Sequence, residues 1–426
     1  MTLVFAETDR AIPLVSMTVA LRAGAVHEPP ERAGLARIAA RMLRRGCRGL
    51  SSDELESRID SLGAELGTSA GLVSTMVHVE LLARSAPEVA RLLGRLLAHP
   101  SFDQAELDRL KRQTEAEITE SRDSDAFLAG RAFRRQLFAG HPHSRRVAGT
   151  IATVGAIERQ DVERWHRAHF VRENAVVVVV GNLSEEAVAE LSEAVTAELP
   201  SGRATPYPAT EPVPPDGRNL VLVDKPERTQ TQMVIGTLGT HPRDRDHTAL
   251  LVANTAFGGT FTARMVQEIR AKRGWSYGAS SHLSTGRVRE AFSMWAAPAA
   301  GDTAACLRLE LEMLSRWRED GISAEELAFC KSYLRRSYAF EIETAKKRAA
   351  QWLDRALLDL PEDYHHGFVE RVEAVTLEDA NAAIGQRIDD GRLWMSLVCT
   401  EADLGAELRQ AVDRLGDVVV VPYDLE

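Results

Sequence analysis

The side chains best suited to hold a metal are few and widely spaced in this chain. His166 and His169 stand three residues apart beside Trp165 on an expected helix, where a surface or packing role is favoured over ligation. His365 and His366 are adjacent, so they point apart on a helix and are expected to face solvent. The histidines therefore predict no metal centre of their own.

A second set of chemically capable residues lies in a block with clear local signals. The Gly258-Gly259 pair predicts a turn, Thr260 can cap the helix that follows, and Gly274 can end that helix in a left-handed conformation. Arg270 then falls in the last helical turn, and Tyr277 on the strand that leaves it. Singly, each has an ordinary explanation, since a helix dipole favours a terminal arginine and strands favour tyrosine. A phosphate-binding loop at the two glycines is disfavoured, because no lysine follows them as in a P-loop.

A proline-rich stretch divides the chain into two halves, and the helices and strands of these halves must position the residues described above. Six of the 17 prolines lie between Pro200 and Pro215, which predicts an extended linker over residues 201–217 between domains 1–200 and 218–426. Each half opens with an alternating strand, Leu14 to Leu21 or Gln232 to Thr237. Each half ends with a buried strand, Val176 to Val180 or Trp394 to Cys399. The pattern predicts two duplicated α+β domains, each a mostly antiparallel sheet with helices packed on one face.

Composition narrows the functional class. The net charge of −10 over 426 residues disfavours nucleic-acid binding, which usually needs a basic surface. No apolar run approaches the roughly 18 residues of a membrane span. The four cysteines are far apart in the sequence and predict reduced thiols rather than a disulfide scaffold. The first ten residues do not read as a signal peptide, so the cytoplasm is favoured, with the bacterial periplasm as the alternative if an upstream segment has been removed.

Four blocks of the sequence carry a resemblance when they are taken together and in order. The blocks are Leu21 to Ala36, His141 to Gly181, Asp224 to Gln230, and Phe257 to Tyr277. They resemble the insulinase/pitrilysin family of peptidases with an inverted zinc motif, and within it the alpha-type subunits of the mitochondrial processing peptidase. The resemblance covers nearly the whole chain, and it implies a bowl-shaped pair of domains.

The resemblance places the zinc motif of the family on residues that cannot bind zinc. The family motif is His-x-x-Glu-His on a helix, which sets two ligands one turn apart with a general base between them. Here Arg37, Ala40 and Arg41 occupy those positions, and Glu117 matches the remaining ligand. A guanidinium stays protonated and repels a cation, so no metal is expected on this chain.

The arginines suggest a structural replacement. Arg37, Arg41, Arg44 and Arg48 fall on one helical stripe, and the family fold would bring Glu117 opposite it. An Arg–Glu ion pair replacing the metal bridge is one hypothesis. A solvated basic helix face is the alternative.

The resemblance also gives Arg270 and Tyr277 a role. They match a pair that reaches the substrate peptide, and both are donors suited to an oxygen that gains charge during hydrolysis. Gly258 and Gly259 match the substrate loop. The resemblance thus implies a catalytically incomplete subunit that binds a short or unfolded peptide and forms a heterodimer with a homologous zinc-bearing chain. The alternatives are a structural core subunit and a peptide-binding protein that does not cleave.

Overall fold

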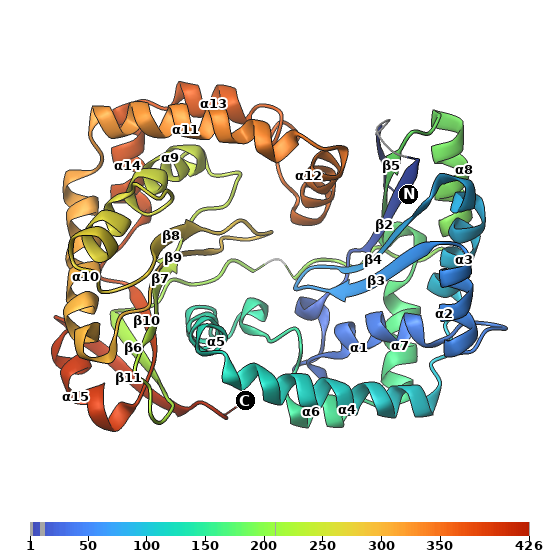
Figure 1. The fold of residues 1–426 in the computed structure, drawn as a ribbon, viewed down its shortest axis with the longest axis horizontal. Coiled ribbons are helices and arrows are strands. Elements are labelled where there is room, and N and C mark those ends of the chain that lie inside the picture. The colour runs from blue at the N-terminus through green and yellow to red at the C-terminus, as the bar shows by residue number, and fades with distance from the viewer. Residues whose placement is uncertain (1–2, 9–12, 209, 426) are drawn as a thin grey trace. The chain divides into compact units, whose positions relative to one another are not determined.

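The computed structural model describes residues 3–8, 13–208 and 210–425, and it divides the chain into two compact units (Figure 1). Unit 1 comprises Met1–Thr119, Arg145–Ala209 and Phe340–Asp359, and unit 2 comprises Glu120–Ser144, Thr210–Ala339 and Leu360–Glu426. Each unit therefore takes one segment from the other half of the sequence, which differs from the contiguous domains 1–200 and 218–426 expected from the linker. The proline-rich segment marks where the chain passes from its first half to its second, but it does not show which unit each helix joins.

Unit 1 contains a five-stranded sheet in the order β1-β5-β2-β4-β3. The β1–β5 pair is parallel and the other three pairs are antiparallel. Its strands are β1 Leu3–Glu7, β2 Leu14–Leu21, β3 Ala64–Ala70, β4 Thr75–Leu82 and β5 Ala175–Gly181. Its main helices are α1 Leu35–Met42, α2 Ser52–Ser61, α3 Ala86–Ala98, α4 Gln104–Glu120, α6 Ile151–Gly155, α7 Arg159–His169, α8 Glu185–Thr196 and α12 Ala345–Leu358.

Unit 2 contains a six-stranded sheet in the order β11-β6-β10-β7-β9-β8. The first two pairs are parallel and the remaining three are antiparallel. Its strands are β6 Arg218–Asp224, β7 Gln232–Leu238, β8 Ala279–Leu283, β9 Ala291–Ala296, β10 Leu393–Cys399 and β11 Leu415–Pro422. Its main helices are α5 Asp125–Leu137, α9 His247–Phe257, the π-helix η8 Val266–Lys272, α10 Thr303–Asp320, α11 Ala324–Ile342, α13 Phe368–Ala374, α14 Leu377–Arg387 and α15 Glu401–Gln410.

The strands predicted from apolar runs are confirmed, and their burial explains their composition. Every residue of β5 and of β10 is buried. In β5, Val177 and Val179 join the larger core of unit 1, while Val178 and Val180 pack on the opposite face against α12. A strand covered on both faces needs apolar side chains at every position, so it loses the alternation of a half-exposed strand.

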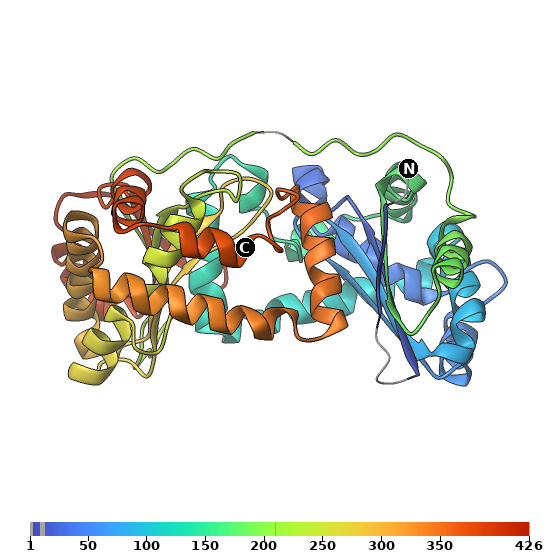
Figure 2. The same cartoon turned by 90° about the horizontal axis from the view of Figure 1, so that it is seen from above.

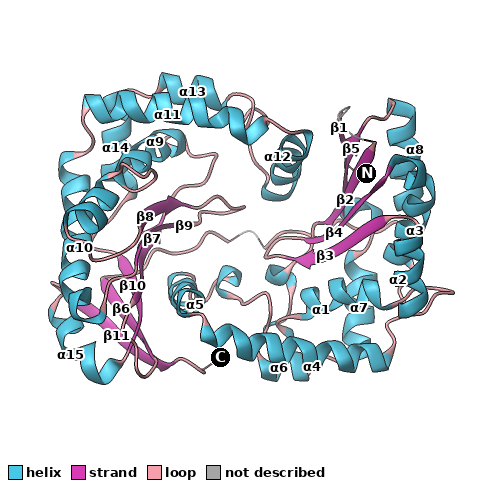
Figure 3. Cartoon of the chain, in the orientation of Figure 1, coloured by secondary structure: helices cyan, strands magenta, loops and turns pink. Residues whose placement is uncertain are grey.

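The α+β class and the duplicated, mostly antiparallel sheets are as predicted, and the structure adds one helix to the second face of each sheet. Helix α12 comes from the second half of the sequence and packs on β5 and β1 in unit 1. Helix α5 comes from the first half and packs on β10, β7 and β6 in unit 2 (Figure 3). An amphipathic helix pattern shows that a face must be buried, but not which sheet buries it.

The predicted linker is a segment without helix or strand, as the upper edge of Figure 2 shows for residues 201–208 and 210–217. All four cysteines are free and buried. Within the described residues, no helix combines the length and the apolar character needed to cross a membrane.

Candidate functional site

Helix α1 carries the arginines at the zinc-motif positions, and a buried carboxylate holds its start. Glu28 accepts hydrogen bonds from the backbone N–H groups of Gly34 (3.0 Å) and Ala36 (2.6 Å), which the helix itself leaves without partners. Burial raises the pKa of Glu28 to about 7, although both hydrogen bonds act in the other direction. Glu28 lies within the block Leu21 to Ala36, but its capping role was not among the sequence predictions.

Arg37 and Arg41 converge on Glu117 of α4. Arg37 donates to one carboxylate oxygen at 2.7 Å, and Arg41 donates to both oxygens at 2.9 Å. Arg41 also donates to the Thr114 hydroxyl at 3.1 Å. The side chains are 18–32% exposed, so these charge-assisted bonds are partly shielded from water. The hypothesised ion pair between the two helices is present.

Zinc does not fit this cluster. The two side chains at the ligand positions are permanent cations, and Glu117 already accepts three N–H bonds from them. Ala40, at the general-base position, is buried and has no proton to exchange. Across residues 3–8, 13–208 and 210–425, no three His, Cys, Asp or Glu side chains gather closely enough to hold a metal ion.

The predicted arginine stripe ends at Arg41, so the expectation for the other two arginines is wrong. Helix α1 stops at Met42 and passes into the 3₁₀ turn η3 Leu43–Arg45, whose tighter winding shifts Arg44 relative to the α-helical stripe. Gly46 then adopts a φ of 107°, which turns the chain away before Arg48. Arg44 instead pairs with Glu56 at 2.9 Å, and Arg48 donates to His99 at 2.9 Å. A helix that ends early cannot keep residues at later turns on one face.

Arg270, in unit 2, lies between two aromatic rings. Its guanidinium carbon is 4.7 Å from the centre of the Phe261 ring and 4.9 Å from that of Tyr277. Phe261 is 69% exposed and Tyr277 is 90% exposed. Phe261 was not among the predicted site residues, and its place two residues after Gly259 in the expected substrate loop was the available signal.

The other cations of this segment are neutralised, whereas Arg270 is not. Arg264 makes two 2.6 Å bonds to Glu326, while Lys272 and Arg273 both pair with Glu268. Among the described residues, Arg270 has no hydrogen bond or ion pair to another side chain. Its N–H groups are therefore available to a ligand.

The local structure around Arg270 departs in three ways from the expected helix and strand. The helix begins at Arg264 rather than at a Thr260 cap, and residues 266–272 form a π-helix, a rare form often found at functional sites. Gly274 does end it, with a φ of 66°. Tyr277 lies in the loop two residues before β8, not on the strand, which explains its exposure.

Close packing requires the glycines of the expected substrate loop. The Gly258 carbonyl accepts from the Ser281 N–H of β8 at 3.1 Å, and a Cβ at Gly258 would lie 2.3 Å from that nitrogen. A Cβ at Gly259 would lie 2.9 Å from the Thr255 Cα. The two glycines thus bring α9 against β8 and leave Phe261 in the exposed loop beyond them.

Ser276 stands within a Gly-x-Ser-x-Gly spacing at residues 274–278, which in hydrolases can present a nucleophile. Here Ser276 is 5% exposed, its hydroxyl donates to the Gly278 carbonyl, and it accepts from the Ala297 N–H at 3.0 Å. This serine is a buried structural group.

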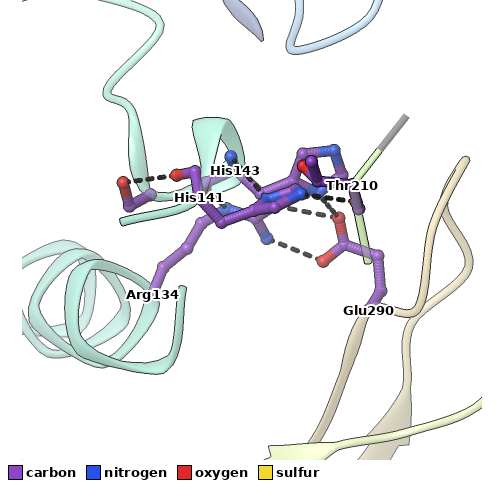
Figure 4. A network of polar contacts seen from close by, with 6 residues as sticks. Arg134, His141, His143, Thr210 and Glu290 are labelled. Atoms are coloured by element: carbon purple, nitrogen blue, oxygen red, sulfur yellow. Dashed lines mark hydrogen bonds and ion pairs between the residues drawn. The ribbon is translucent and has the colours of Figure 1, made fainter. Parts of the chain in front are cut away.

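A buried polar network, absent from the sequence predictions, fixes the segment after α5 (Figure 4). Glu290 accepts hydrogen bonds from His143 at 2.5 Å and from both terminal nitrogens of Arg134 at 2.9 and 3.0 Å. Burial alone would raise the pKa of Glu290, but the bonds from His143 and Arg134 outweigh it and hold the pKa below its usual value. His141 Nε2 lies 2.9 Å from the Thr210 carbonyl, so the network also contacts the middle of the linker.

The remaining histidines divide between packing and exposure. Of the surface and packing roles that were favoured over ligation, His166 takes the packing role, stacked on Phe170 with Nε2 2.7 Å from the Leu97 carbonyl. Burial, then nearby His27, lowers the pKa of His169 to about 4. His366 is exposed as expected, whereas His365 is only partly exposed and its Nε2 atom is buried.

Comparison with known proteins agrees with this geometry. Residues 3–151 match the family described as Insulinase (Peptidase family M16), and residues 156–334 match the Peptidase M16 inactive domain. An uncharacterized zinc protease of Mycobacterium leprae is 27% identical over 387 residues, covering 89% of this chain and 85% of that protein. A non-peptidase homolog of Helicobacter pylori is 22% identical over 394 residues, covering 92% and 90%.

A solved structure shares the fold over nearly its whole length. The peptidase M16 inactive domain protein from Pseudomonas fluorescens superimposes with a TM-score of 0.85 at 22% identity, covering 93% of this chain and 95% of that one. Two consecutive family matches and a common fold account for both halves of the sequence. The chain belongs to the insulinase (M16) family of metallopeptidases, and it carries the family fold with an incomplete zinc motif.

Proposed function

We propose that this chain is the zinc-free subunit of a heterodimeric peptidase. It binds a short or unfolded peptide and, through Arg270 and Tyr277, completes the active site of a homologous partner that holds the zinc. The observation that carries the proposal is the open guanidinium of Arg270, which lacks a carboxylate partner among the described residues although Arg264, Lys272 and Arg273 nearby all have one.

The chemistry of the pair suits peptide hydrolysis. When a peptide carbonyl is attacked, its oxygen gains negative charge, and donors already aimed at that position lower the barrier. The guanidinium offers a planar fork of N–H groups, and stacking between Phe261 and Tyr277 limits its rotation. The exposed Tyr277 adds a phenol O–H. In this proposal the partner supplies the metal, and this chain supplies binding and charge stabilisation.

A purely structural subunit is the second candidate, and the Arg37–Glu117–Arg41 cluster favours it. That cluster joins two helices without any metal, as a scaffold needs. The names of the relatives divide in the same way, between a zinc protease in Mycobacterium leprae and a non-peptidase homolog in Helicobacter pylori. A peptide-binding protein that does not cleave is an intermediate case.

The test combines the purified chain with a homologous chain that carries an intact His-x-x-Glu-His motif and follows cleavage of a quenched fluorescent peptide. Activity is expected only with both chains, and Arg270→Ala should reduce kcat/KM by about 10²–10³, the usual effect of removing one such donor. Arg273→Ala, which removes a guanidinium already paired with Glu268, is the matched control. Equal cleavage by the zinc-bearing chain alone would leave only the structural or peptide-binding function.

A further inference from the structure

The two sheets correspond strand by strand except at one edge. The parallel pair β1–β5 of unit 1 matches β6–β10 of unit 2, and β2, β4 and β3 match β7, β9 and β8 in order and direction. Unit 2 has one strand more, because β11 pairs in parallel with the outer edge of β6. In the described part of the chain, no strand pairs with the outer edge of β1 (Figure 3).

The sequence explains why unit 1 lacks this strand. Helix α8 follows β5 as α15 follows β10, and β11 comes directly after α15. The residues after α8 instead form the proline-rich linker. Because proline has no N–H to donate, a segment with so many prolines cannot make the continuous row of hydrogen bonds to β1 that a regular sixth strand needs.

A groove lies where the sixth strand would be. It has a volume of about 890 Å³ and runs between β1 and α8, lined on the strand side by Val4 and Ala6 and on the helix side by Val188 and Ser192. Its lining also includes four charged residues, Arg172, Glu173, Glu185 and Glu193, so apolar contacts are confined to part of the groove. Val4 is 44% exposed. In unit 2, by contrast, Leu415 and Val418 of β11 pack against the core.

Two further features mark this edge as a binding site. The Ser192 hydroxyl, 5% exposed, has no hydrogen-bond partner within the described residues, although such buried groups are normally satisfied. The sequence Leu3-Val-Phe-Ala-Glu7 also contains neither proline nor lysine, the residues that commonly protect an exposed strand edge from pairing.

We propose that the open edge of β1 binds an extended apolar segment of another polypeptide, which adds to the sheet as a sixth strand in the groove against α8. The segment resembles β11 itself, with consecutive or alternating β-branched residues and no charge in its middle. Backbone hydrogen bonds to β1 provide the affinity, and the groove selects the side chains that face α8. This site lies wholly within unit 1 and does not depend on the proposed peptidase function.

The test uses a fluorescein-labelled peptide with the sequence of Leu415–Pro422 and the full chain, followed by fluorescence anisotropy. Saturable binding is expected, together with slower amide hydrogen exchange in residues 3–8. Ala189→Trp, at an exposed groove position on α8, should weaken binding at least tenfold by filling the groove. Glu190→Trp, at the next exposed position outside the groove, is the matched control and should bind normally.

Specificity for a strand is tested with a second peptide in which prolines replace the residues equivalent to Val419 and Val420. Adjacent residues of a strand point their N–H groups to opposite sides, so one of the two prolines removes a hydrogen bond to β1 whichever way the peptide lies, and this peptide should not bind. The proposal is overturned if the first peptide does not bind saturably, if Ala189→Trp binds it as well as the unmodified chain, or if the proline peptide binds equally. Displacement of β11 in unit 2 would appear as binding that Ala189→Trp does not change.

Discussion

Arg41 and Arg270 are chemically identical side chains that the protein places in opposite surroundings. Arg41 makes a two-pronged ion pair with Glu117 and a further bond to Thr114. Arg270 has two aromatic rings around it and no carboxylate among the described residues. Arg41 uses its N–H groups to join α1 to α4, whereas the N–H groups of Arg270 can still donate to a ligand. The groups that already accept hydrogen bonds from an arginine, rather than the residue type, distinguish a structural arginine from one that can bind a ligand.

The largest expected effect comes from a buried carboxylate that, unlike Glu117, has no partner among the described residues. Glu310 of α10 is 0% exposed, and both of its oxygens lack hydrogen-bond partners within the described residues. Burial raises the pKa of Glu310 to about 8, from an ordinary value of 4.5. Between these values the unfolded chain releases the proton that the folded chain retains, so raising the pH favours unfolding.

The free energy of unfolding should therefore fall between pH 4.5 and pH 8, by roughly 5 kcal/mol from this group, at about 1.4 kcal/mol per pKa unit. Glu310→Gln cannot ionise and should remove this part of the pH dependence. Urea unfolding of both proteins at pH 5 and pH 8.5 measures it, and taking the difference between the proteins cancels other groups such as Glu28. Parallel pH profiles would show that Glu310 has a partner or reaches water.

The next largest change in the free energy of unfolding is expected when Glu117, in the Arg37–Glu117–Arg41 cluster, is neutralised. Glu117→Gln leaves Arg37 and Arg41 side by side with no counter-charge, so we expect the free energy of unfolding to drop by about 1–2 kcal/mol. Glu56→Gln, which breaks the more exposed pair with Arg44, should cost no more than about 0.5 kcal/mol. Thermal or urea unfolding measures both variants. Equal losses would mean that the Arg37–Glu117–Arg41 cluster has no special structural role.

Substitution of Arg270 should change the activity of the heterodimer rather than the stability of this chain. Arg270→Lys keeps the charge but loses the planar fork, so we expect kcat/KM of the heterodimer to fall about tenfold, as for the loss of one good hydrogen bond of about 1.4 kcal/mol. Unfolding should shift by less than about 0.5 kcal/mol, since no ion pair is broken. Arg273→Lys is the matched control in the same segment. A large stability loss in Arg270→Lys with unchanged cleavage would reverse the distinction between the two arginines.

The strands and the positions of Arg37 and Arg41 could be predicted from the sequence, whereas many of the side chains and helices that surround them could not. Runs such as Ala175–Gly181 are apolar because both faces are buried, a property that a sequence displays directly. The pairing of Arg37 and Arg41 with Glu117 followed from helical spacing together with the family resemblance. The exchange of α5 and α12 could not be foreseen, because an apolar helix face does not specify its partner. Arg44 lies in the 3₁₀ turn Leu43–Arg45 rather than in the α-helix, and Arg48 follows Gly46, which ends the helical run. Neither change could be predicted, since a glycine can equally lie within a longer helix.

Phe261 gives the smallest and most selective test of the comparison, because it touches Arg270 without offering a polar group. Replacing it with leucine keeps apolar bulk but removes the ring face beneath the guanidinium, an interaction worth about 0.5–1 kcal/mol at an exposed site. We therefore expect Phe261→Leu to lower kcat/KM of the heterodimer by about two- to fivefold, since Arg270 is then held less rigidly. Phe329→Leu is the matched control, an exposed phenylalanine of unit 2 that stacks on Tyr333 instead. If both variants lose activity equally, loss of exposed aromatic surface explains the effect; if neither does, Arg270 orients substrate without help from this ring.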